Sequence, residues 1–311
     1  MRTARPSRWR RLPTEAAHSG SADLDRLGVA RVVALMQSED RRVLQALRAA
    51  RRQIVRAATA LRDVYLAGGN CLLFGAGTSG RLAVIEAAEL PPTFGTEPRR
   101  VRAFIAGGPA AVFRSREGAE DALAEGARRG ARARPGDLVI GVSASAVTPF
   151  VRGALARARA RGARTVLLCA NPSREARALA DIVVALRVGP EIVAGSTRLK
   201  AGTATKLALN QITTSAFASA GRVFGPWMMD LSRGSAKLRD RAVRTVGAAT
   251  GTSAPGARRL LARAHGDVRT AIAMGRSGAR YAAAREALSR AGGDLRAALE
   301  ALVRKAPRGR A

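Results

Sequence analysis

The stretch GAGTSGRLAVIEAAELPPTFG, from Gly75 to Gly95, decides the fold of this chain. It comes directly after the apolar run CLLF, and Gly75, Gly77 and Gly80 have the G-x-G-x-x-G spacing of a tight turn from a strand into a helix. Such a turn places backbone amides around a phosphate group. The stretch therefore predicts an α/β fold with a phosphate-binding turn.

Four further apolar runs follow, and most of them are separated by a segment with helical periodicity. Together with the first run, the strand candidates are residues 70–77, 101–108, 137–145, 165–171 and 182–189. Alternation of buried strands with helices is typical of a doubly wound parallel sheet, a three-layer sandwich with helices on both faces.

The sequence divides into three regions. Residues 1–66 are predicted to form an N-terminal arm and one long helix, whose amphipathic pattern opens at Ser38 and runs to about Leu66. Residues 67–250 hold the sheet domain and a long apolar helix that begins at Ser196. Residues 251–311 are predicted to be a small helical bundle with a basic tail. In this bundle AHGDVRTAI recurs as AGGDLRAAL, with a glycine ending one helix and an aspartate capping the next.

A dinucleotide cofactor is not expected at the glycine-rich turn. Such a cofactor needs an acidic residue at the end of the second strand to hold the ribose, whereas this strand ends FIAGGPAA. The turn instead has Thr78 and Ser79, and a second strand-to-helix turn, GVSASAVTP, has Ser143, Ser145 and Thr148. Two hydroxyl-rich turns at one sheet edge predict a phosphomonoester held from two sides without a cofactor, although helix capping alone explains either turn by itself.

A third polar cluster precedes the long apolar helix. Glu191, Ser196, Thr197 and Lys200 lie where a strand turns into that helix. The two hydroxyls suit substrate contact and simple capping equally well. Lys200 is one of only four lysines and is placed to reach an anion at the helix start, so all four residues are predicted to bind substrate.

Charge and composition argue against several other kinds of site. The net charge of +31 comes mostly from arginines scattered among alanines, and only 4% of residues are aromatic, so nucleic acid is not the predicted partner. An anionic substrate fits the charge. Two distant histidines and two cysteines in apolar runs predict neither a metal site nor a disulfide. Without a long apolar run or a secretory signal, the chain is predicted to be cytoplasmic and to have no membrane partner.

Four blocks in order carry a family resemblance. GAGTSGRLAVIEAAELPPTFG, SREGAEDALAEGARR, VGPEIVAGSTRLKAGTATKLALNQ and GRVFGPWMMDLSRGSAKLRDRA resemble the signature blocks of N-acetylmuramic acid 6-phosphate etherases, members of the sugar isomerase (SIS) superfamily. The resemblance begins at about Leu12 and implies an SIS-type sandwich with a C-terminal bundle like a ubiquitin-associated domain. It also implies cleavage of the D-lactyl ether of N-acetylmuramic acid 6-phosphate by a homodimer that uses no metal.

The same resemblance assigns an acid–base pair to Glu89 and Glu120. Elimination of an ether beta to a carbonyl needs a base at C2 of the opened sugar and an acid at the departing oxygen, and two carboxyl groups in different environments can divide these roles. The resemblance makes Glu89 the acid and Glu120 the base, with the reverse assignment left open. Pairing with one of the many arginines is the alternative for either glutamate. Glu89 is predicted to end its helix just before two prolines, where a negative charge opposes the helix dipole, so no structural role accounts for it.

A shared active site follows from the length of this helix. If it is continuous from Thr78 to Glu89, its two ends are about 17 Å apart at 1.5 Å per residue. A sugar phosphate held at Thr78 does not span that distance easily. We therefore predict that Glu89 acts on the substrate of a neighbouring subunit.

Departures from the family pattern leave other functions open. Leu90 stands where a cysteine is common, and Ala146 and Val147 replace a glycine–arginine pair. The main alternative is a non-catalytic sugar-phosphate-binding regulator of the glucokinase-regulator type. Weaker alternatives are an aldose–ketose isomerase, for which the core blocks lack a histidine, and a nucleic-acid-binding regulator, for which the region before residue 70 offers only an arm and one helix.

Overall fold

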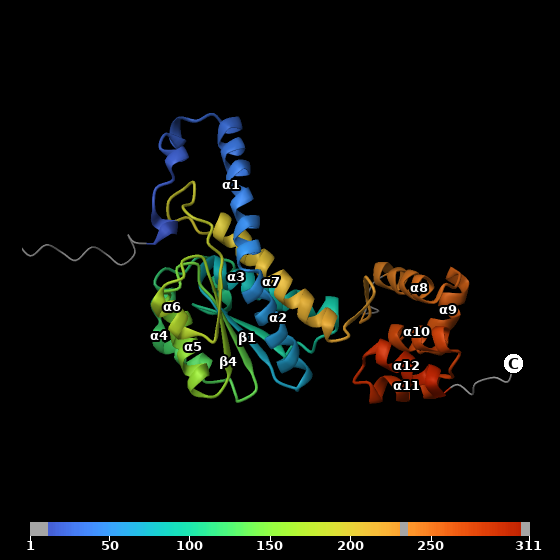
Figure 1. Cartoon of the computed structure of the whole chain (residues 1–311). Helices are drawn as coiled ribbons and strands as arrows, with labels where there is room; N and C mark the ends of the chain where they lie inside the picture. The colour runs from blue at the N-terminus through green and yellow to red at the C-terminus, as the bar shows by residue number, and fades with distance from the viewer. Residues whose placement is uncertain (1–11, 231–235, 306–311) are drawn as a thin grey trace, which may run out of the picture. The chain divides into compact units, whose positions relative to one another are not determined.

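The computed structural model describes residues 12–230 and 236–305, and these pack as two units (Figure 1). Within the described residues, the first unit holds the chain up to Ala88 and Pro98–Ser215. The second holds Glu89–Glu97 and the chain from Ala216 onward. The first eleven residues of the predicted arm and the basic tail after residue 305 lie outside the described residues.

A five-stranded parallel sheet forms the centre of the first unit, in the order β2-β1-β3-β4-β5. Its strands are β1 (Cys71–Gly75), β2 (Val101–Ile105), β3 (Leu138–Val142), β4 (Arg164–Cys169) and β5 (Ile182–Ala185). Every residue of β1 and β3 is buried, because helices cover both faces of the sheet. The five predicted strands and the doubly wound α/β class are confirmed.

The covering helices lie in two layers (Figure 1). One side of the sheet has α4 (Leu123–Gly130), α5 (Pro149–Ala160) and α6 (Arg174–Leu179), and the other has α2 (Arg51–Leu66), α3 (Gly77–Phe94) and α7 (Lys200–Ser219). Phe74 of β1 stacks on Phe104 of β2, with ring centroids 4.9 Å apart, and packs in one core cluster with Phe150 of α5. This packing fixes the carboxyl ends of β1, β2 and β3, from which the candidate site is built.

The N-terminal arm differs from the prediction. Helix α1 (Val29–Ala49) begins nine residues before Ser38 and ends before Ala50, so the predicted single helix is two helices, α1 and α2. Ser38 does not cap a helix, because its hydroxyl donates a hydrogen bond to the carbonyl oxygen of Leu35 at 2.7 Å within α1. Three short 3-10 turns precede α1: η2 (Pro13–Glu15), η3 (Ser19–Ser21) and η4 (Leu24–Arg26).

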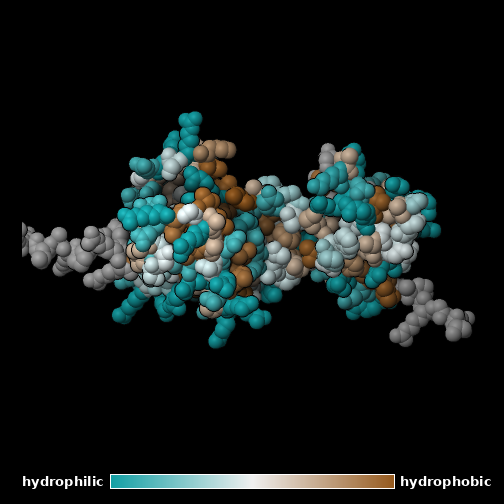
Figure 2. Space-filling model, turned by 90° about the horizontal axis from the view of Figure 1, so that it is seen from above, coloured by the Kyte–Doolittle hydropathy of each residue, from teal (hydrophilic) through white to brown (hydrophobic). Residues whose placement is uncertain are grey.

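Helix α1 also has an unusually exposed N-terminal half. No residue from Val29 to Arg42 is buried, and the side chains of Val29 and Val33 are 82% and 46% exposed. Figure 2 shows hydrophobic residues among hydrophilic ones on the side seen from above, from which α1 projects in Figure 1. Exposed apolar side chains on one helix are typical of a surface that another chain covers.

Helix α3 is continuous through Pro91 and Pro92, so the prediction that Glu89 ends the helix is wrong. The two prolines remove two backbone donors from the helix. Burial of Leu90 and Phe94 offsets this loss, and the Phe94 ring stacks on that of Phe217 with centroids 5.2 Å apart. The dipole argument for a functional Glu89 therefore does not apply.

The second unit is a helical bundle with a two-stranded hairpin. Its elements are β6 (Val223–Phe224), β7 (Trp227–Met228), α8 (Ala236–Thr250), α9 (Ala254–Arg263), α10 (Val268–Ser277), α11 (Tyr281–Arg290) and α12 (Leu295–Lys305). The predicted aspartate caps are present: Asp267 accepts from the amide of Thr270 at 2.7 Å and Asp294 from that of Arg296 at 2.8 Å.

The boundary between the units differs from the predicted division at 250/251. Helix α8 belongs with the bundle, because Val246 and Ala249 are buried in the same core as Ala257 and Ile272. Among the described helices of both units, none combines the length and hydrophobicity that a bilayer-spanning segment requires.

Candidate functional site

A cavity of about 350 Å³ opens in the first unit at the carboxyl ends of β1, β2 and β3. Six predicted site residues and neighbouring polar groups meet there, although they are far apart in the sequence. The predicted residues that line it are Thr78, Ser79, Glu120, Ser145, Thr148 and Thr197. The two hydroxyl-rich turns therefore face one cavity, and a carboxylate accompanies them.

The first turn owes its shape to the glycines. A Cβ on Gly80 would lie 2.5 Å from the Ile105 side chain, and one on Gly75 would lie 2.6 Å from the Gly80 nitrogen. Gly77, with φ +52°, begins α3. These close approaches bring the first amides of α3, with the half-buried Thr78 and Ser79, to the cavity.

In the second turn three hydroxyls form one network. Ser143 Oγ lies 2.8 Å from Thr148 Oγ1 and 3.4 Å from Ser145 Oγ. Ser143 is buried and does not line the cavity, so it orients the other two. Pro149 is the first residue of α5, as predicted. Ala146 has φ +62°, a conformation that favours glycine.

The third polar cluster divides between the cavity and the protein interior. Thr197 lines the cavity, whereas Ser196, Glu191 and Lys200 do not. The fully buried Glu191 carboxylate accepts from the amides of Lys200 and Ala201 at 3.1 and 2.9 Å, which caps α7. Burial raises the pKa of Glu191, and these amide hydrogen bonds reduce the rise without reversing it.

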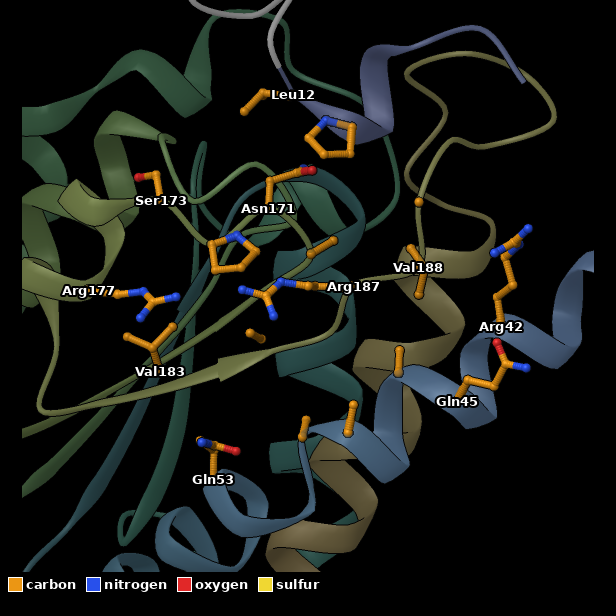
Figure 3. Close-up of a pocket in the computed structure, with 18 of the residues that line it drawn as sticks. Leu12, Arg42, Gln45, Gln53, Asn171, Ser173, Arg177, Val183, Arg187 and Val188 are labelled. Carbon is orange, nitrogen blue, oxygen red and sulfur yellow. The ribbon is translucent and has the colours of Figure 1, made fainter. Parts of the chain in front are cut away.

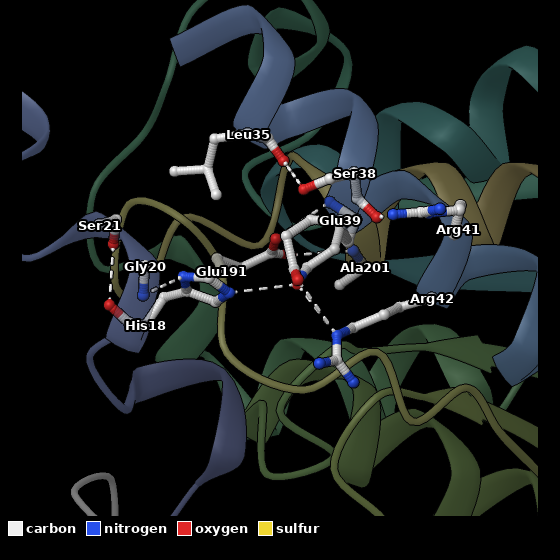
Figure 4. Close-up of polar contacts among 11 residues, drawn as sticks. His18, Gly20, Ser21, Leu35, Ser38, Glu39, Arg41, Arg42, Glu191 and Ala201 are labelled. Carbon is white, nitrogen blue, oxygen red and sulfur yellow. Dashed lines mark hydrogen bonds and ion pairs between the residues drawn. The ribbon is translucent and has the colours of Figure 1, made fainter. Parts of the chain in front are cut away.

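Lys200 forms an ion pair with Glu39 of α1. Glu39 also accepts from Arg42 Nε at 3.1 Å and lies 3.3 Å from His18 Nε2 (Figure 4). The other ring nitrogen of His18 accepts from the amide of Gly20, so the ring proton faces Glu39. Burial by itself raises the pKa of Glu39, but the hydrogen bonds from Lys200 and Arg42 outweigh it and lower the pKa to about 2. These contacts of Glu39 with Lys200, Arg42 and His18 connect the N-terminal arm to α7.

The two candidate catalytic glutamates have different positions. Glu120 lies in the 3-10 turn η6 (Ala119–Asp121) and lines the cavity, with an exposed side chain. Glu89 is exposed on α3, belongs to the second unit and is not among the residues that line the cavity. Among the described residues neither glutamate makes an ion pair, so the alternative of pairing with an arginine finds no support.

Glu15 is a cavity residue that the sequence reasoning missed. The neighbouring Thr14 is buried and fixes its place: the Thr14 hydroxyl accepts from Asn171 Nδ2 at 2.8 Å, and its carbonyl oxygen accepts from the Gly195 amide at 2.9 Å. A Cβ on Gly195, whose φ is +76°, would lie 2.8 Å from the Glu15 carboxylate. These partners are more than 150 residues away in sequence, so the only signal was that the family resemblance begins near Leu12.

Two cationic side chains of the cavity were also missed. Arg81 donates from Nε to the carbonyl oxygen of Val112 at 2.8 Å, which holds the loop before Glu120. Arg116 of that loop is exposed. Two guanidinium groups beside the hydroxyl turns make the cavity suitable for an anion.

This chain is similar to two family models, to curated relatives and to solved structures. The family model of the glucokinase regulatory protein N-terminal SIS domain matches residues 53–159, and the SIS domain model matches residues 120–215. The chain is 43% identical over 263 residues to an N-acetylmuramic acid 6-phosphate etherase from Symbiobacterium thermophilum, covering 84% of this chain and 88% of that protein. It is 47% identical over 235 residues to the etherase of Gloeobacter violaceus, covering 75% and 77%. A solved phosphoheptose isomerase from Neisseria gonorrhoeae is 18% identical, with a TM-score of 0.46 over 61% of this chain and 98% of that one.

Proposed function

Because the chain belongs to the N-acetylmuramic acid 6-phosphate etherase family, we propose that it cleaves the D-lactyl ether of N-acetylmuramic acid 6-phosphate. The products are N-acetylglucosamine 6-phosphate and D-lactate, so the enzyme is a carbon–oxygen lyase of cell-wall amino sugar recycling. The observation that carries the proposal is the single cavity in which two hydroxyl-rich turns meet Glu120.

The hydroxyl turns bind and orient the substrate in this mechanism. Ser79 and Ser145 hold the phosphate with the first amides of α3, and Thr78, Thr148 and Thr197 complete its surroundings. Arg81 and Arg116 offer guanidinium donors to the phosphate oxygens. Lys200, Glu191, Ser143 and Ser196 support these groups from behind, as their positions outside the cavity suggest.

The carboxyl groups move the protons. Glu120 takes the C2 proton of the opened sugar, the C3–oxygen bond breaks, and the departing lactyl oxygen takes a proton from the second carboxyl group, assigned to Glu89. Water then adds at C3 and a proton returns to C2, which restores the sugar. No redox partner is needed, because the elimination and the hydration leave the oxidation state of the sugar unchanged.

We further propose that the enzyme is a cytoplasmic homodimer. The apolar side chains on the unburied half of α1, Val29 and Val33 among them, offer a surface for a second copy of the chain. A dimer would also supply Glu89 from one chain to the cavity of the other.

The test of the proposed reaction is product analysis in deuterated water. Incubation with N-acetylmuramic acid 6-phosphate should release D-lactate and leave one solvent deuterium at C2 of the sugar. The same sugar without its phosphate should react with a kcat/KM at least about a hundredfold lower, because the binding energy that orients the sugar is lost. Equal rates for both sugars, or lactate without deuterium at C2, would contradict this mechanism.

A regulator remains the second candidate, since the matched family model describes a glucokinase regulatory protein domain. Ala146 and Val147, which depart from the pattern of the etherases, lie beside the hydroxyls of the second turn. Binding of the sugar phosphate without any lactate release would favour this function over the etherase.

Glu15 is predicted to bind the sugar rather than its phosphate, because a carboxylate repels the phosphate and accepts hydrogen bonds from hydroxyls. Glu15→Gln should raise KM by about tenfold, the usual value of one hydrogen bond to a charged group, with kcat changed much less. Steady-state kinetics measures the effects on KM and on kcat separately.

Glu117→Gln is the matched control, since Glu117 lines the same cavity and is exposed like Glu15, but it lacks the anchoring that Thr14 gives Glu15. We expect its KM to stay close to that of the unaltered protein. An unchanged KM for Glu15→Gln, or an equal rise for both variants, would remove Glu15 from the binding site.

A further inference from the structure

A second and larger cavity, of about 840 Å³, lies in the first unit and shares no lining residue with the candidate site (Figure 3). One wall is the junction of α1 and α2, including Ala46, Ala50 and Gln53, and the other is formed by β5 and the loops after β4 and β5. None of the predicted site residues lines it. The etherase mechanism therefore does not explain this cavity.

The charge of the cavity is strongly positive. Of the residues that the structure describes, four arginines line it, namely Arg42, Arg56, Arg177 and Arg187, and one acidic residue, Asp181. Asp181 is already engaged: its carboxylate accepts from the amide and the hydroxyl of Thr165, both at 2.8 Å, and lies 3.4 Å from a guanidinium nitrogen of Arg159. Arg42 is likewise paired with Glu39.

Arg177 and Arg187 have no such partner. Within residues 12–230 and 236–305, neither guanidinium makes an ion pair or a hydrogen bond. Figure 3 shows the two groups pointing toward one another across the cavity. Both lie near Cys169: burial raises the pKa of this thiol to about 12, and the charges of Arg187 and Arg177 limit the rise. An anion bound between two converging cations would be attracted by both charges.

The remaining lining limits the kind of anion. Planar guanidinium forks match the oxygens of a phosphate group. Among the described residues no aromatic side chain lines the cavity, so these residues offer a nucleotide base no stacking surface. The small apolar residues of the helix junction and Val183 leave room beside the arginines, and Gln53 offers hydrogen bonds to hydroxyl groups. The volume is within the range of small-molecule sites.

We propose that this cavity is a second binding site for a sugar phosphate, whose phosphate lies between Arg177 and Arg187 and whose sugar lies against the α1–α2 junction. The site is separate from the etherase cavity and does not depend on the proposed reaction.

Calorimetric titration with glucose 6-phosphate, which has no lactyl ether, tests the proposal. The host protein carries Ser79→Ala and Ser145→Ala, which disable the first cavity. Adding R177Q and R187Q to this host should weaken binding by at least about tenfold, the usual loss with a charge-assisted hydrogen bond. Adding R164Q and R174Q instead removes the same charge from exposed arginines outside the cavity and should change affinity by less than about twofold.

Three outcomes would overturn the proposal: unchanged binding in R177Q/R187Q, an equal loss in R164Q/R174Q, or dissociation of an oligomer by R177Q/R187Q without loss of glucose 6-phosphate binding. The last would mean that a second copy of the chain occupies the cavity. With Ser79 and Ser145 intact, R177Q/R187Q should still release lactate, which shows that the first cavity is preserved. Absence of lactate from every protein would reject the etherase function and leave this binding result in force.

Discussion

Glu120→Gln is expected to lower kcat by at least about a hundredfold, because glutamine has the shape of glutamate but cannot take the C2 proton. Glu120 lines the cavity and makes no ion pair among the described residues, so the substitution removes no salt bridge. The protein should therefore stay folded. Lactate release and exchange of the C2 proton with deuterated water are both expected to be lost.

The comparison with Glu89→Gln separates base from acid. If Glu89 is the acid, its glutamine variant should still exchange the C2 proton while releasing lactate at least about a hundredfold more slowly. Glu117→Gln, in the same loop as Glu120, is the control and should keep both activities. If proton exchange at C2 is lost only in Glu89→Gln, then Glu89 is the base and Glu120 is the acid. Near-normal turnover in Glu120→Gln would exclude it as a catalytic residue.

The sequence predicted those parts of the fold whose signals are local. Apolar runs marked the five strands because both faces of the sheet are covered, and Pro149 and Asp267 marked helix starts through their own backbone chemistry. The turn glycines followed from close approaches within one strand–turn–helix unit, as at Gly75 and Gly80. The two hydroxyl turns were placed together for the same reason, since parallel strands end at one edge.

Predictions failed where a distant partner decides the role of a side chain. Lys200 was expected to face an anion, and it does, but the anion is Glu39, which lies 161 residues away in sequence. Glu15 reaches the cavity beside Thr14, which is held by Asn171, 157 residues away, and by the Gly195 amide. The helix ends near Ser38 and Pro91 were also misplaced, because burial of Phe94 and the continuity of α1 override local preferences. Helix α8 joins the bundle through buried contacts that no boundary signal marks.

The second large effect is expected when two inactive variants are mixed. Helix α3 is continuous from Gly77 to Phe94, so Thr78 and Glu89 are about 17 Å apart along its axis. If Glu89 serves the neighbouring subunit, a Glu89→Gln chain has an intact cavity and a Ser79→Ala/Ser145→Ala chain has an intact Glu89. Subunit exchange between them should restore lactate release to about a quarter of the unaltered level, because half the dimers are mixed and each has one complete site.

Recovery of lactate release requires that one chain provides the intact cavity and the other provides Glu89. A chain carrying all three substitutions gives the matched control, since mixing it with either parent variant leaves no site with both an intact cavity and Glu89. These mixtures should stay inactive, and mass spectrometry of differently tagged chains can establish that exchange occurred. If exchange is complete and the first mixture also stays inactive, Glu89 cannot act across the dimer. The acid would then have to come from the same chain as Glu120, and Glu15, which already lines that cavity, would be the carboxyl group to replace next.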